Sequence, residues 1–589
     1  MSRDGQQVAA PRDGPKTPDP SPQHLGPAPS TGGATHRREA LLRRFARHPA
    51  KILAVLYPGA LLAGFVLTRV GTSTWDTPAH RAYMLWLVGK WHGRDLPVPF
   101  ETIKWYGPLW EYVLAFFDAA LRFLGDPLWV RHSVTFTLLP LTLVGTYVLL
   151  RRAGETPGTA CLACALLASN IRFLGHSILN VKDFPFACGY LLCTLLMWIV
   201  LREKLATPAG LLSRPGWLLM LTALSVLPYL LRAPVFSHWL LLCGMCLYVA
   251  LRAPRGLSGE RRWPWAFLPL LAGPFIVWSL WPTLWEAGIR GFGQSFGLFS
   301  RFTWVGRVRA FGWNYSATEL PWWYGPAWIP VSWEPIGLVL LAVGALGFLL
   351  MVAHDFHHYR ARPVGLLLHS LPVWVALFAV SPWAAVLVLR PVLYDEERHL
   401  LFAMPLLAVS AALGLRRLAD PMKLALAGLV LVSVLQSVTV WGKYAYVYKN
   451  PLLPHSESED EDFMGDYWVV ATGAMAQALY DRVPNGAYVV VVAPLDPLMV
   501  ELERRERSLL LHAQAGKSFR LEDKGPPSGD FYVLATNRNG MSRRILEDIR
   551  AGTAREIWSE KMPPGDRSAA VLAYYTEPCG HCRMKVRLL

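Results

Sequence analysis

Long apolar runs recur along this chain, and short polar stretches separate them. A helix needs about 20 mostly apolar residues to cross a bilayer. Runs of this kind predict eleven transmembrane helices, of which the third is short, at residues 52–70, 129–150, 157–171, 184–201, 216–231, 235–251, 265–283, 335–353, 364–389, 400–415 and 423–441. The pattern therefore predicts a polytopic all-α membrane protein.

Charged residues between the runs orient these helices. A basic stretch with a single acid, Glu39, comes directly before the first run, and further basic loops begin at Arg151, Arg202, Arg252, Arg360 and Arg416. Because Lys and Arg collect in cytoplasmic loops, these stretches are predicted to face the cytoplasm. The long loops 71–128 and 284–334 and the segment 442–589 are then predicted to lie on the outer side.

The two ends of the chain differ from its middle. Residues 1–50 are rich in Pro, Gly and Ser and end in basic residues, which predicts a disordered cytoplasmic tail. Residues 442–589 carry apolar runs short enough for buried strands, at 487–493 and 531–535, and a helical pattern at 545–551. We therefore expect a small extracytoplasmic α/β domain there, after a transmembrane domain at residues 51–441.

Composition narrows the classes of function. Of the 589 residues, 53% are hydrophobic and 17% are charged, whereas soluble domains carry about 25% charged residues. The net charge of +16 does not indicate nucleic acid as a partner, because Lys and Arg collect in the cytoplasmic loops of membrane proteins. The chain also lacks the GxxxxGK[ST], GxGxxG and HExxH signatures, so no binding site for a nucleotide-sugar donor is visible.

Cysteines and metal-ligand spacings add little chemistry. Six of the eight cysteines form close pairs inside apolar segments, where free Cys behaves as a small hydrophobe. Cys579 and Cys582 are expected to form a local disulfide or an idle pair. No spacing of His, Cys and carboxylate residues demands a metal, so we assign no cofactor and no metal ligand and leave a divalent metal open.

Polar residues gather in four places on the predicted outer side. These are Asp76 with His80, Lys104 with Tyr106, the stretch from Arg172 to Asp183, and the charged residues at 395–399. Charged groups are costly near lipid, so such clusters indicate function. Structural alternatives stay open, because Asp76 suits a helix cap and Lys104 an interfacial anchor. Acids at 396 and 397 would also suit the start of a helix.

Several of these stretches match a known family, in order along the chain. They are Asp76, residues 172–186 (RFLGHSILNVKDFPF), residues 321–324 (PWWY), Arg398 with His399, residues 448–451 (YKNP) and residues 466–468 (DYW). From about residue 50 to about residue 480, the chain resembles bacterial members of glycosyltransferase family 39. That family includes protein O-mannosyltransferases and lipid A aminoarabinose transferases. Val181 departs from the family pattern, which has Pro there.

The resemblance implies a GT-C fold and a bacterial plasma (inner) membrane enzyme. Such an enzyme transfers a sugar from a polyprenyl-phosphate donor, with inversion, to a hydroxyl of an acceptor protein, lipid or polysaccharide on the outer side of the membrane. By similarity, Asp76 is the catalytic base, and Asp183 orients a donor group or a cation. The candidates for binding substrate and its phosphate are His80, Lys104, Tyr106, Arg172, His176, Asn180, Lys182, Arg398 and His399.

Two other classes of function remain as alternatives. A transporter or flippase of a lipid or glycolipid would place ionisable groups near the bilayer midplane, often with repeated halves. An assembly or scaffold protein would work through residues 442–589. Charged residues here gather on the outer loops and no repeat is evident, which favours the glycosyltransferase.

Overall fold

The structure is a computed structural model. It describes Leu62, Thr68 and residues 73–205, 208–232, 235–252, 263–300, 302, 304, 306–360, 363–453, 463–492, 497–502, 520–522, 530–536, 543–563 and 567–576. The predicted tail at 1–50, all but two residues of the predicted first helix, the centre of the basic loop after Arg252 and the Cys579/Cys582 pair lie outside these described residues.

Ten of the eleven predicted transmembrane segments fall largely in the described part of the chain, and each contains an apolar helix. Five are long enough to cross a membrane: α5 (Pro127–Phe136) with α6 (Leu138–Arg152), α9 (Asp183–Lys204), α18 (Pro335–Tyr359), α20 (Leu371–Leu389) and α22 (Asp420–Trp441). Five are shorter: α7 (Pro157–Ala168), α11 (Pro215–Leu231), α12 (Ser237–Arg252), α14 (Leu268–Leu280) and the 3₁₀ helix η5 (Arg398–Ala403) with α21 (Met404–Gly414). Among the described residues, five helices are thus long and apolar enough to cross a membrane, and the prediction of eleven spans is not confirmed.

A helix cap divides one of the predicted segments. The predicted segment 364–389 divides at Ser370, whose hydroxyl accepts a hydrogen bond from the Val373 N–H at 3.1 Å. This cap begins α20 and separates it from α19 (Pro363–His369). A Ser cap satisfies an N–H that the first turn of a helix leaves free. Local hydrogen bonding thus interrupts runs that hydropathy alone would join.

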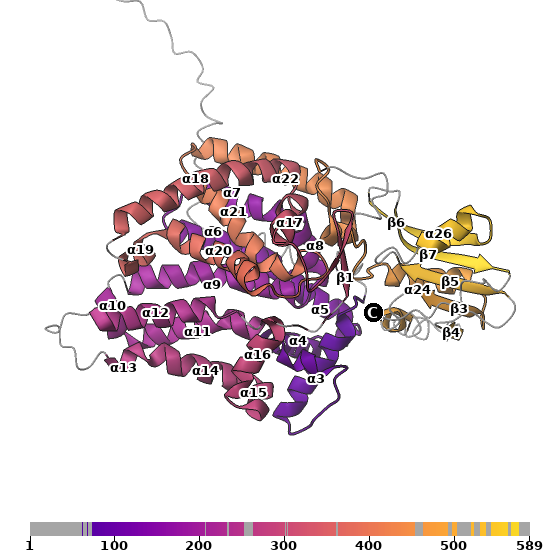
Figure 1. Ribbon diagram of the computed structural model, residues 1–589, viewed down its shortest axis with the longest axis horizontal. Helices are drawn as coiled ribbons and strands as arrows, with labels where there is room; N and C mark the ends of the chain where they lie inside the picture. The colour runs from indigo at the N-terminus through magenta and orange to yellow at the C-terminus, as the bar shows by residue number, and fades with distance from the viewer. Residues whose placement is uncertain are drawn as a thin grey trace, which may run out of the picture. The chain divides into compact units, whose positions relative to one another are not determined.

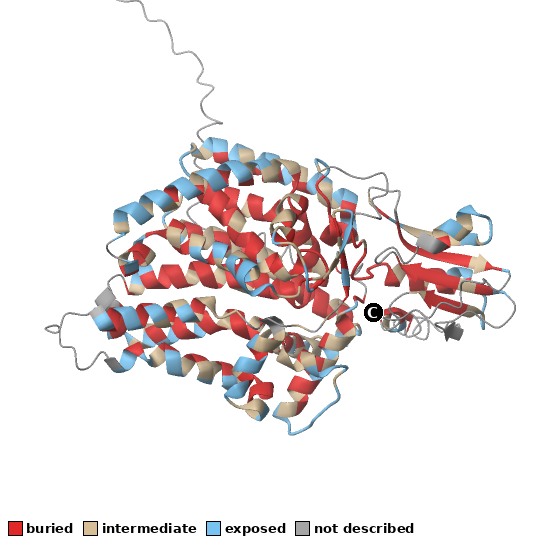
Figure 2. Cartoon of the chain, in the orientation of Figure 1, coloured by how far each residue is buried: buried red, intermediate tan, exposed pale blue. Residues whose placement is uncertain are grey.

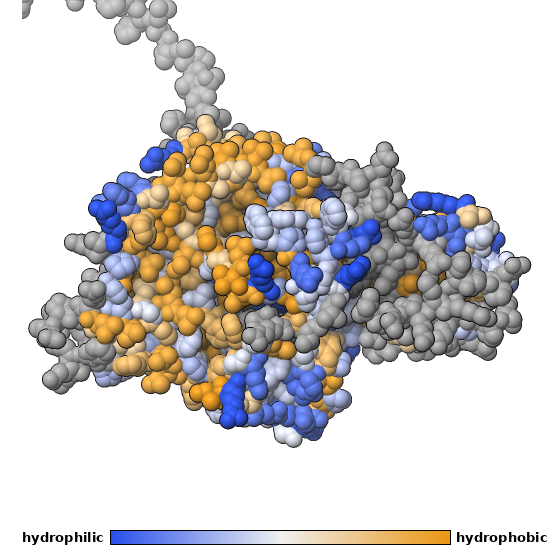
Figure 3. Space-filling view, viewed as in Figure 1, coloured by the Kyte–Doolittle hydropathy of each residue, from blue (hydrophilic) through white to orange (hydrophobic). Residues whose placement is uncertain are grey.

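Helix α9 forms the centre of the helical body, and α18 and α22 form part of its outer surface. In the most apolar window of each helix, 83% of α9 is buried, against 28% of α18 and 22% of α22 (Figure 2). The exposed side chains of α18 and α22 are largely Leu and Val, and Figure 3 shows an apolar surface over these helices. A broad apolar surface of this kind matches a lipid-facing boundary.

Close helix packing surrounds this centre. Helices α7, α18, α21 and α22 lie side by side, and α9 lies between α6 and α11 (Figure 1). Gly344 of α18 and Gly414 of α21 allow two backbones to approach, because a Cβ at either position would collide with the facing main chain. Small residues permit such contacts between membrane helices. The remaining short helices of this body are α10 (Pro208–Ser213) and α13 (Trp263–Ala266).

The predicted outer loops contain secondary structure of their own. Loop 71–128 holds α3 (Thr77–Trp91), η2 (Glu101–Trp105), α4 (Leu109–Ala120) and η3 (Arg122–Leu124). The region around 284–334 holds α15 (Pro282–Ala287), α16 (Arg290–Ser300), α17 (Tyr324–Ser332) and an antiparallel hairpin of β1 (Arg307–Ala310) and β2 (Trp313–Ser316). Two further elements, α8 (Ile171–Leu179) and η6 (Gly442–Val447), pack against each other.

The C-terminal residues form a five-stranded sheet with the order β4-β3-β5-β7-β6. Its elements are α24 (Thr472–Arg482), β3 (Tyr488–Val492), β4 (Arg520–Glu522), β5 (Phe531–Thr536), α26 (Arg543–Arg550), β6 (Arg555–Met562) and β7 (Arg567–Tyr575). Strand β3 pairs in parallel with β4 and β5, whereas β7 pairs antiparallel with β5 and β6. Strands β3 and β5 and helix α26 lie at the positions that the sequence pattern indicates.

Candidate functional site

Asp76 lies directly before α3 and faces two cations. Its Oδ2 atom lies 2.7 Å from Lys182 Nζ and 3.0 Å from Arg398 Nη1. The side chain of Asp76 makes no capping hydrogen bond to α3, so the structure does not support a capping role. Asp76 is also the most open member of this group, with 22% of its side chain exposed against 8% for Lys182 and 3% for Arg398.

A second carboxylate, Asp183, lies at the start of α9. Arg232, which follows α11, forms an ion pair with its Oδ1, and Arg398 Nε lies 3.9 Å from its Oδ2. Asn180 holds the turn that presents Asp183: its Oδ1 accepts hydrogen bonds from the N–H groups of Lys182 (3.2 Å) and Asp183 (2.7 Å). Asp183 is only 2% exposed, and the charged partners of its carboxylate are Arg232 and Arg398.

These residues form one electrically balanced group. Arg398 Nη1 also lies 3.1 Å from Asp395 Oδ2. We call the three acids and three bases together the Asp76 cluster, and its members are Asp76, Lys182, Asp183, Arg232, Asp395 and Arg398. A balanced set of buried charges is far less costly than an unpaired one, and its cations can exchange partners when an anion enters.

Aromatic rings cover the cations of the Asp76 cluster. The Tyr106 ring lies 5.3 Å from Lys182 Nζ and 5.6 Å from Arg232 Cζ. Arg398 Cζ lies 5.0 Å from the ring of Tyr394 and 5.7 Å from the ring of Trp468. Cation–π contacts of this geometry stabilise a buried positive charge without neutralising it.

The electrostatics of the Asp76 cluster keep Asp76 ionised. Burial alone would raise the pKa of Asp76, but Lys182 and Arg398 outweigh burial and hold the pKa well below its usual value. Burial lowers the pKa of the neighbouring His80, against the opposing effect of Glu111. His80 Nδ1 lies 2.8 Å from Glu111 Oε1, and Glu111 in turn pairs with Arg131 at 2.9 Å. His80 therefore lies beside Asp76 in a fixed orientation.

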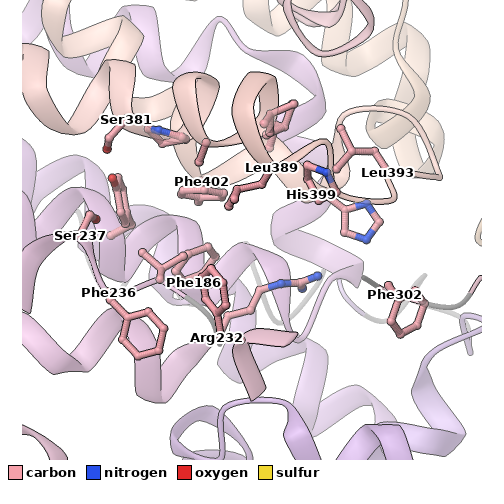
Figure 4. A pocket seen from close by; sticks show the side chains of 18 of the residues that line it. Phe186, Arg232, Phe236, Ser237, Phe302, Ser381, Leu389, Leu393, His399 and Phe402 are labelled. Carbon is pink, nitrogen blue, oxygen red and sulfur yellow. The ribbon is translucent and has the colours of Figure 1, made fainter. Parts of the chain in front are cut away.

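An apolar cavity of about 400 Å³ adjoins the Asp76 cluster. Arg232 and His399 lie together on one side of it, whereas Phe236, Ser237 and Ser381 lie on the other (Figure 4). Its walls come from α9, α12, α20 and η5, and they are mostly Phe, Leu, Val and Pro side chains. Tyr106 and Tyr394 line the cavity and also contact the cations, so the cavity and the Asp76 cluster are continuous.

Two predicted phosphate ligands lie elsewhere. Lys104 Nζ pairs with Glu101 at 2.9 Å, and the Lys104 carbonyl accepts hydrogen bonds from Trp281 and Thr283. Arg172 pairs with Glu396 and Glu397, and its Nε donates to the carbonyl of Tyr448 at 2.6 Å. The structure therefore brings neither Lys104 nor Arg172 to the Asp76 cluster, because nearer acids hold both side chains.

His176 also belongs to the group around Arg172. Its Nε2 lies 3.6 Å from Glu397 Oε1, and its Nδ1 lies 3.0 Å from Asn180 Nδ2. Glu397 directly precedes η5, and its side chain accepts no capping hydrogen bond from that helix. Glu396 and Glu397 are both partners of Arg172.

Arg232 is the residue that sequence reasoning missed. It lies at the outer end of the predicted helix 216–231, where an arginine looks like an ordinary helix end. The only feature of the sequence that could have singled it out is that an arginine stands directly before Ala-Pro in a predicted outer loop.

The described residues contain no candidate metal site. No group of three or more His, Cys, Asp and Glu side chains among them is arranged to hold an ion.

Comparison with known proteins finds likeness in fold only. No family model and no curated protein matches the chain. The chain is similar to ArnT from Cupriavidus metallidurans in the apo state, at 13% identity and a TM-score of 0.45 over 89% of this chain and 98% of that one. ArnT bound to undecaprenyl phosphate gives 13% identity and a TM-score of 0.43 over 91% and 100%.

A third solved structure is the archaeal oligosaccharyltransferase AglB from Archaeoglobus fulgidus, in complex with an inhibitory peptide and a dolichol-phosphate. It gives 12% identity and a TM-score of 0.37 over 74% of this chain and 62% of that chain. These structures are membrane glycosyltransferases of the GT-C kind, which the sequence motifs also resemble. At such low identities and TM-scores they say nothing about individual residues, so function has to be judged from the Asp76 cluster and its cavity.

Proposed function

We propose that this chain is a multi-pass membrane glycosyltransferase of GT-C type. It transfers a sugar from a polyprenyl-phosphate donor to an acceptor hydroxyl on the outer side of the bacterial plasma membrane, with inversion at the anomeric carbon. Its N-terminus is cytoplasmic, and its C-terminal sheet domain is extracytoplasmic.

The observation that carries this proposal is the continuity of the apolar cavity with the Asp76 cluster. A polyprenyl phosphate has an apolar chain and an anionic head. The cavity offers about 400 Å³ lined by Phe, Leu and Val side chains, and Arg232 at its edge belongs to the Asp76 cluster. Apolar pockets with a few convergent polar groups are typical ligand sites. The match between an amphiphilic donor and an amphiphilic pocket supports the proposal.

The proposed reaction uses the carboxylate and the cations separately. The acceptor hydroxyl gives its proton to Asp76 while its oxygen bonds to the anomeric carbon of the sugar. The bond from that carbon to the phosphate oxygen breaks, and polyprenyl phosphate leaves with the bonding electrons. Lys182, Arg232 and Arg398 stabilise the charge that develops on the phosphate. Asp76 suits the role of base because it is the most exposed carboxylate of the Asp76 cluster.

Donor binding would also activate Asp76. Lys182 and Arg398 hold the pKa of Asp76 below its usual value despite burial, which makes the carboxylate a weak base. A phosphate that draws these two cations toward itself weakens their effect on the carboxylate. The pKa of Asp76 then rises toward the working pH when the donor is present.

The direct test of this function is mass spectrometry of membrane lipids, envelope polymers and exported proteins from cells with and without this chain. The proposal predicts a hexose-sized or pentose-sized difference on an exported or outer-surface molecule, together with accumulation of the lipid-linked sugar in cells that lack the chain. A lipid or glycolipid that changes sides of the membrane with no glycosylation difference would support the flippase alternative and contradict the proposal.

A further inference from the structure

Arg172 lies outside the Asp76 cluster in a second group of buried charges. Its guanidinium pairs with Glu396 and Glu397, and all three side chains are at most 1% exposed. We call these three residues with His176 the Arg172 cluster. Such complete burial leaves no access for a substrate phosphate. A different role for Arg172 is therefore required.

The short segment 395–398 joins the two clusters, and its side chains divide between them. Asp395 and Arg398 point toward the Asp76 cluster and pair with each other at 3.1 Å. The two residues between them, Glu396 and Glu397, pair with Arg172. A change in how Arg172 holds this segment would therefore move Arg398, whose Nη1 lies 3.0 Å from Asp76.

Two residues of this segment have a backbone conformation that non-glycine residues disfavour. Asp395 and Glu396 both have positive φ angles, of 54° and 63°. Two successive non-glycine residues in this region are uncommon, and they persist only where surrounding contacts impose the conformation. Among the contacts at Glu396, the ion pair to Arg172 is the only charged one within salt-bridge distance in the described part of the chain.

Several contacts fix the position of Arg172 itself. It lies in the first turn of α8, which Asn170 caps by accepting a hydrogen bond from the Phe173 N–H at 2.9 Å. Its Nε donates to the Tyr448 carbonyl, and its guanidinium lies 4.9 Å from the Trp328 ring. A planar guanidinium can bridge two carboxylates and a carbonyl at once, which a lysine ammonium cannot do in the same geometry.

We propose that Arg172 is a positioning residue that, through Glu396 and Glu397, holds the segment 395–398 so that Arg398 faces Asp76. The expected effect on sugar transfer rests on the proposed function, whereas the effect on the conformation of the segment does not. Arg172 thus acts on the reaction through Arg398 and touches neither donor nor acceptor.

The test measures backbone hydrogen exchange by mass spectrometry in peptides that cover residues 390–403. In Arg172→Gln, amide exchange in this region should accelerate by about tenfold or more, because local opening becomes easier. Arg172→Lys should show a smaller acceleration in the same peptides. Lys423→Gln is the matched control, since Lys423 is another buried cation with an acidic partner, Asp420 at 2.8 Å, and it should leave these peptides unchanged.

A charge-balanced variant separates positioning from simple neutralisation. Burial raises the pKa of Glu396 despite Arg172, so Glu396 readily becomes neutral when Arg172 is removed. Arg172→Gln with Glu397→Gln therefore leaves no buried unpaired charge in the Arg172 cluster, and thermal stability should recover toward the wild type. For this double variant the proposal predicts amide exchange at 390–403 as fast as in Arg172→Gln. It also predicts, for both variants, a donor KM about fivefold to tenfold above the wild-type value.

Several results would overturn the proposal. Unchanged exchange at 390–403 in both Arg172→Gln and Arg172→Lys would show that Arg172 does not hold the segment. If thermal stability, amide exchange and donor KM all return to wild-type values in the double variant, Arg172 only neutralises the two glutamates and does not position the segment. If the wild type transfers no sugar from any polyprenyl-phosphate donor, the proposed function fails, yet the exchange measurement still decides whether Arg172 positions the segment.

Discussion

The two charge clusters of this protein, both on its predicted outer side, differ in how far they are open to a substrate. The Asp76 cluster has one carboxylate that is 22% exposed, and it adjoins a cavity of about 400 Å³. The Arg172 cluster is sealed, with Arg172 and Glu397 fully buried. Both clusters pair acids with bases, so charge alone does not distinguish them. Access does distinguish them, and it is the reason why we propose a catalytic role for the Asp76 cluster and a positioning role for Arg172.

The largest expected effect comes from removing the base. Asp76→Asn keeps the size of the side chain but cannot accept a proton, so sugar transfer should fall by about 10²-fold or more. The same change leaves Lys182 without its acid partner, and some loss of thermal stability should accompany it. Transfer is measured with purified protein and a polyprenyl-phosphate sugar. An Asp76→Asn variant with a wild-type rate would exclude Asp76 as the base.

A charge-balanced double variant distinguishes lost chemistry from lost stability. Asp76→Asn combined with Lys182→Gln removes both members of one ion pair, which should restore much of the melting temperature. Its transfer rate should remain at least as low as that of the single variant. Recovery of transfer along with stability would mean that Asp76 serves only to balance charge.

The cations of the Asp76 cluster should give the next largest effect. Lys182→Gln, Arg232→Gln and Arg398→Gln each remove a charge from the proposed phosphate site, and each should raise the donor KM by about tenfold. Lys90→Gln is the control, because Lys90 pairs with Glu286 and Asp95 away from the Asp76 cluster and should leave the donor KM unchanged. Equal kinetics in all four variants would remove the support for a phosphate site.

Filling the cavity should have a smaller effect that depends on the donor chain. Ser381 lines the cavity on the side away from Arg232, so Ser381→Trp should weaken use of long-chain donors by about fivefold and of short-chain donors less. Val343→Trp adds the same bulk on the exposed surface of α18 and serves as the control. An equal effect of Ser381→Trp on long and short donors would place the donor chain elsewhere.

The smallest expected effect is the pH dependence of stability. The folded pKa of Asp76 lies below its unfolded value, so its ionised form stabilises the fold above about pH 4, and this contribution is lost as the pH falls further. The difference in melting temperature between wild type and Asp76→Asn should therefore shrink by roughly 2–4 °C between pH 6 and pH 3. A difference that grows over this range would contradict the ion pairing around Asp76.

The sequence predicted which charged residues cluster on one side of the membrane, but not how they pair. Asp76, Lys182 and Arg398 were predicted as site residues, and the structure brings them together although Asp76 and Arg398 are 322 positions apart. Arg172 was predicted as a phosphate ligand, yet the structure pairs it with Glu396 and Glu397. Hydrophobic periodicity places residues along helices, whereas ion pairs depend on how distant segments pack.

For the fold as well, local features were predictable and long-range contacts were not. Each predicted apolar segment in the described part of the chain contains a helix, because the pattern of apolar residues is a local property of the sequence. The ends of the helices are harder to predict, since a local cap such as Ser370 begins α20 inside the predicted segment 364–389. Arg232 was missed because its place in the site depends on contacts with distant residues, Asp183 and Tyr106.

We propose that the Asp76 cluster and its cavity together transfer sugar from a polyprenyl phosphate. The most direct measurement incubates the purified chain with synthetic polyprenyl-phosphate hexoses and pentoses and an envelope extract as acceptor, and follows free polyprenyl phosphate and new glycosides by mass spectrometry and NMR. The account predicts acceptor-dependent release of polyprenyl phosphate, a glycoside of inverted anomeric configuration, and loss of both in Asp76→Asn. Donors that bind to the chain yet remain intact with every acceptor fraction would contradict it.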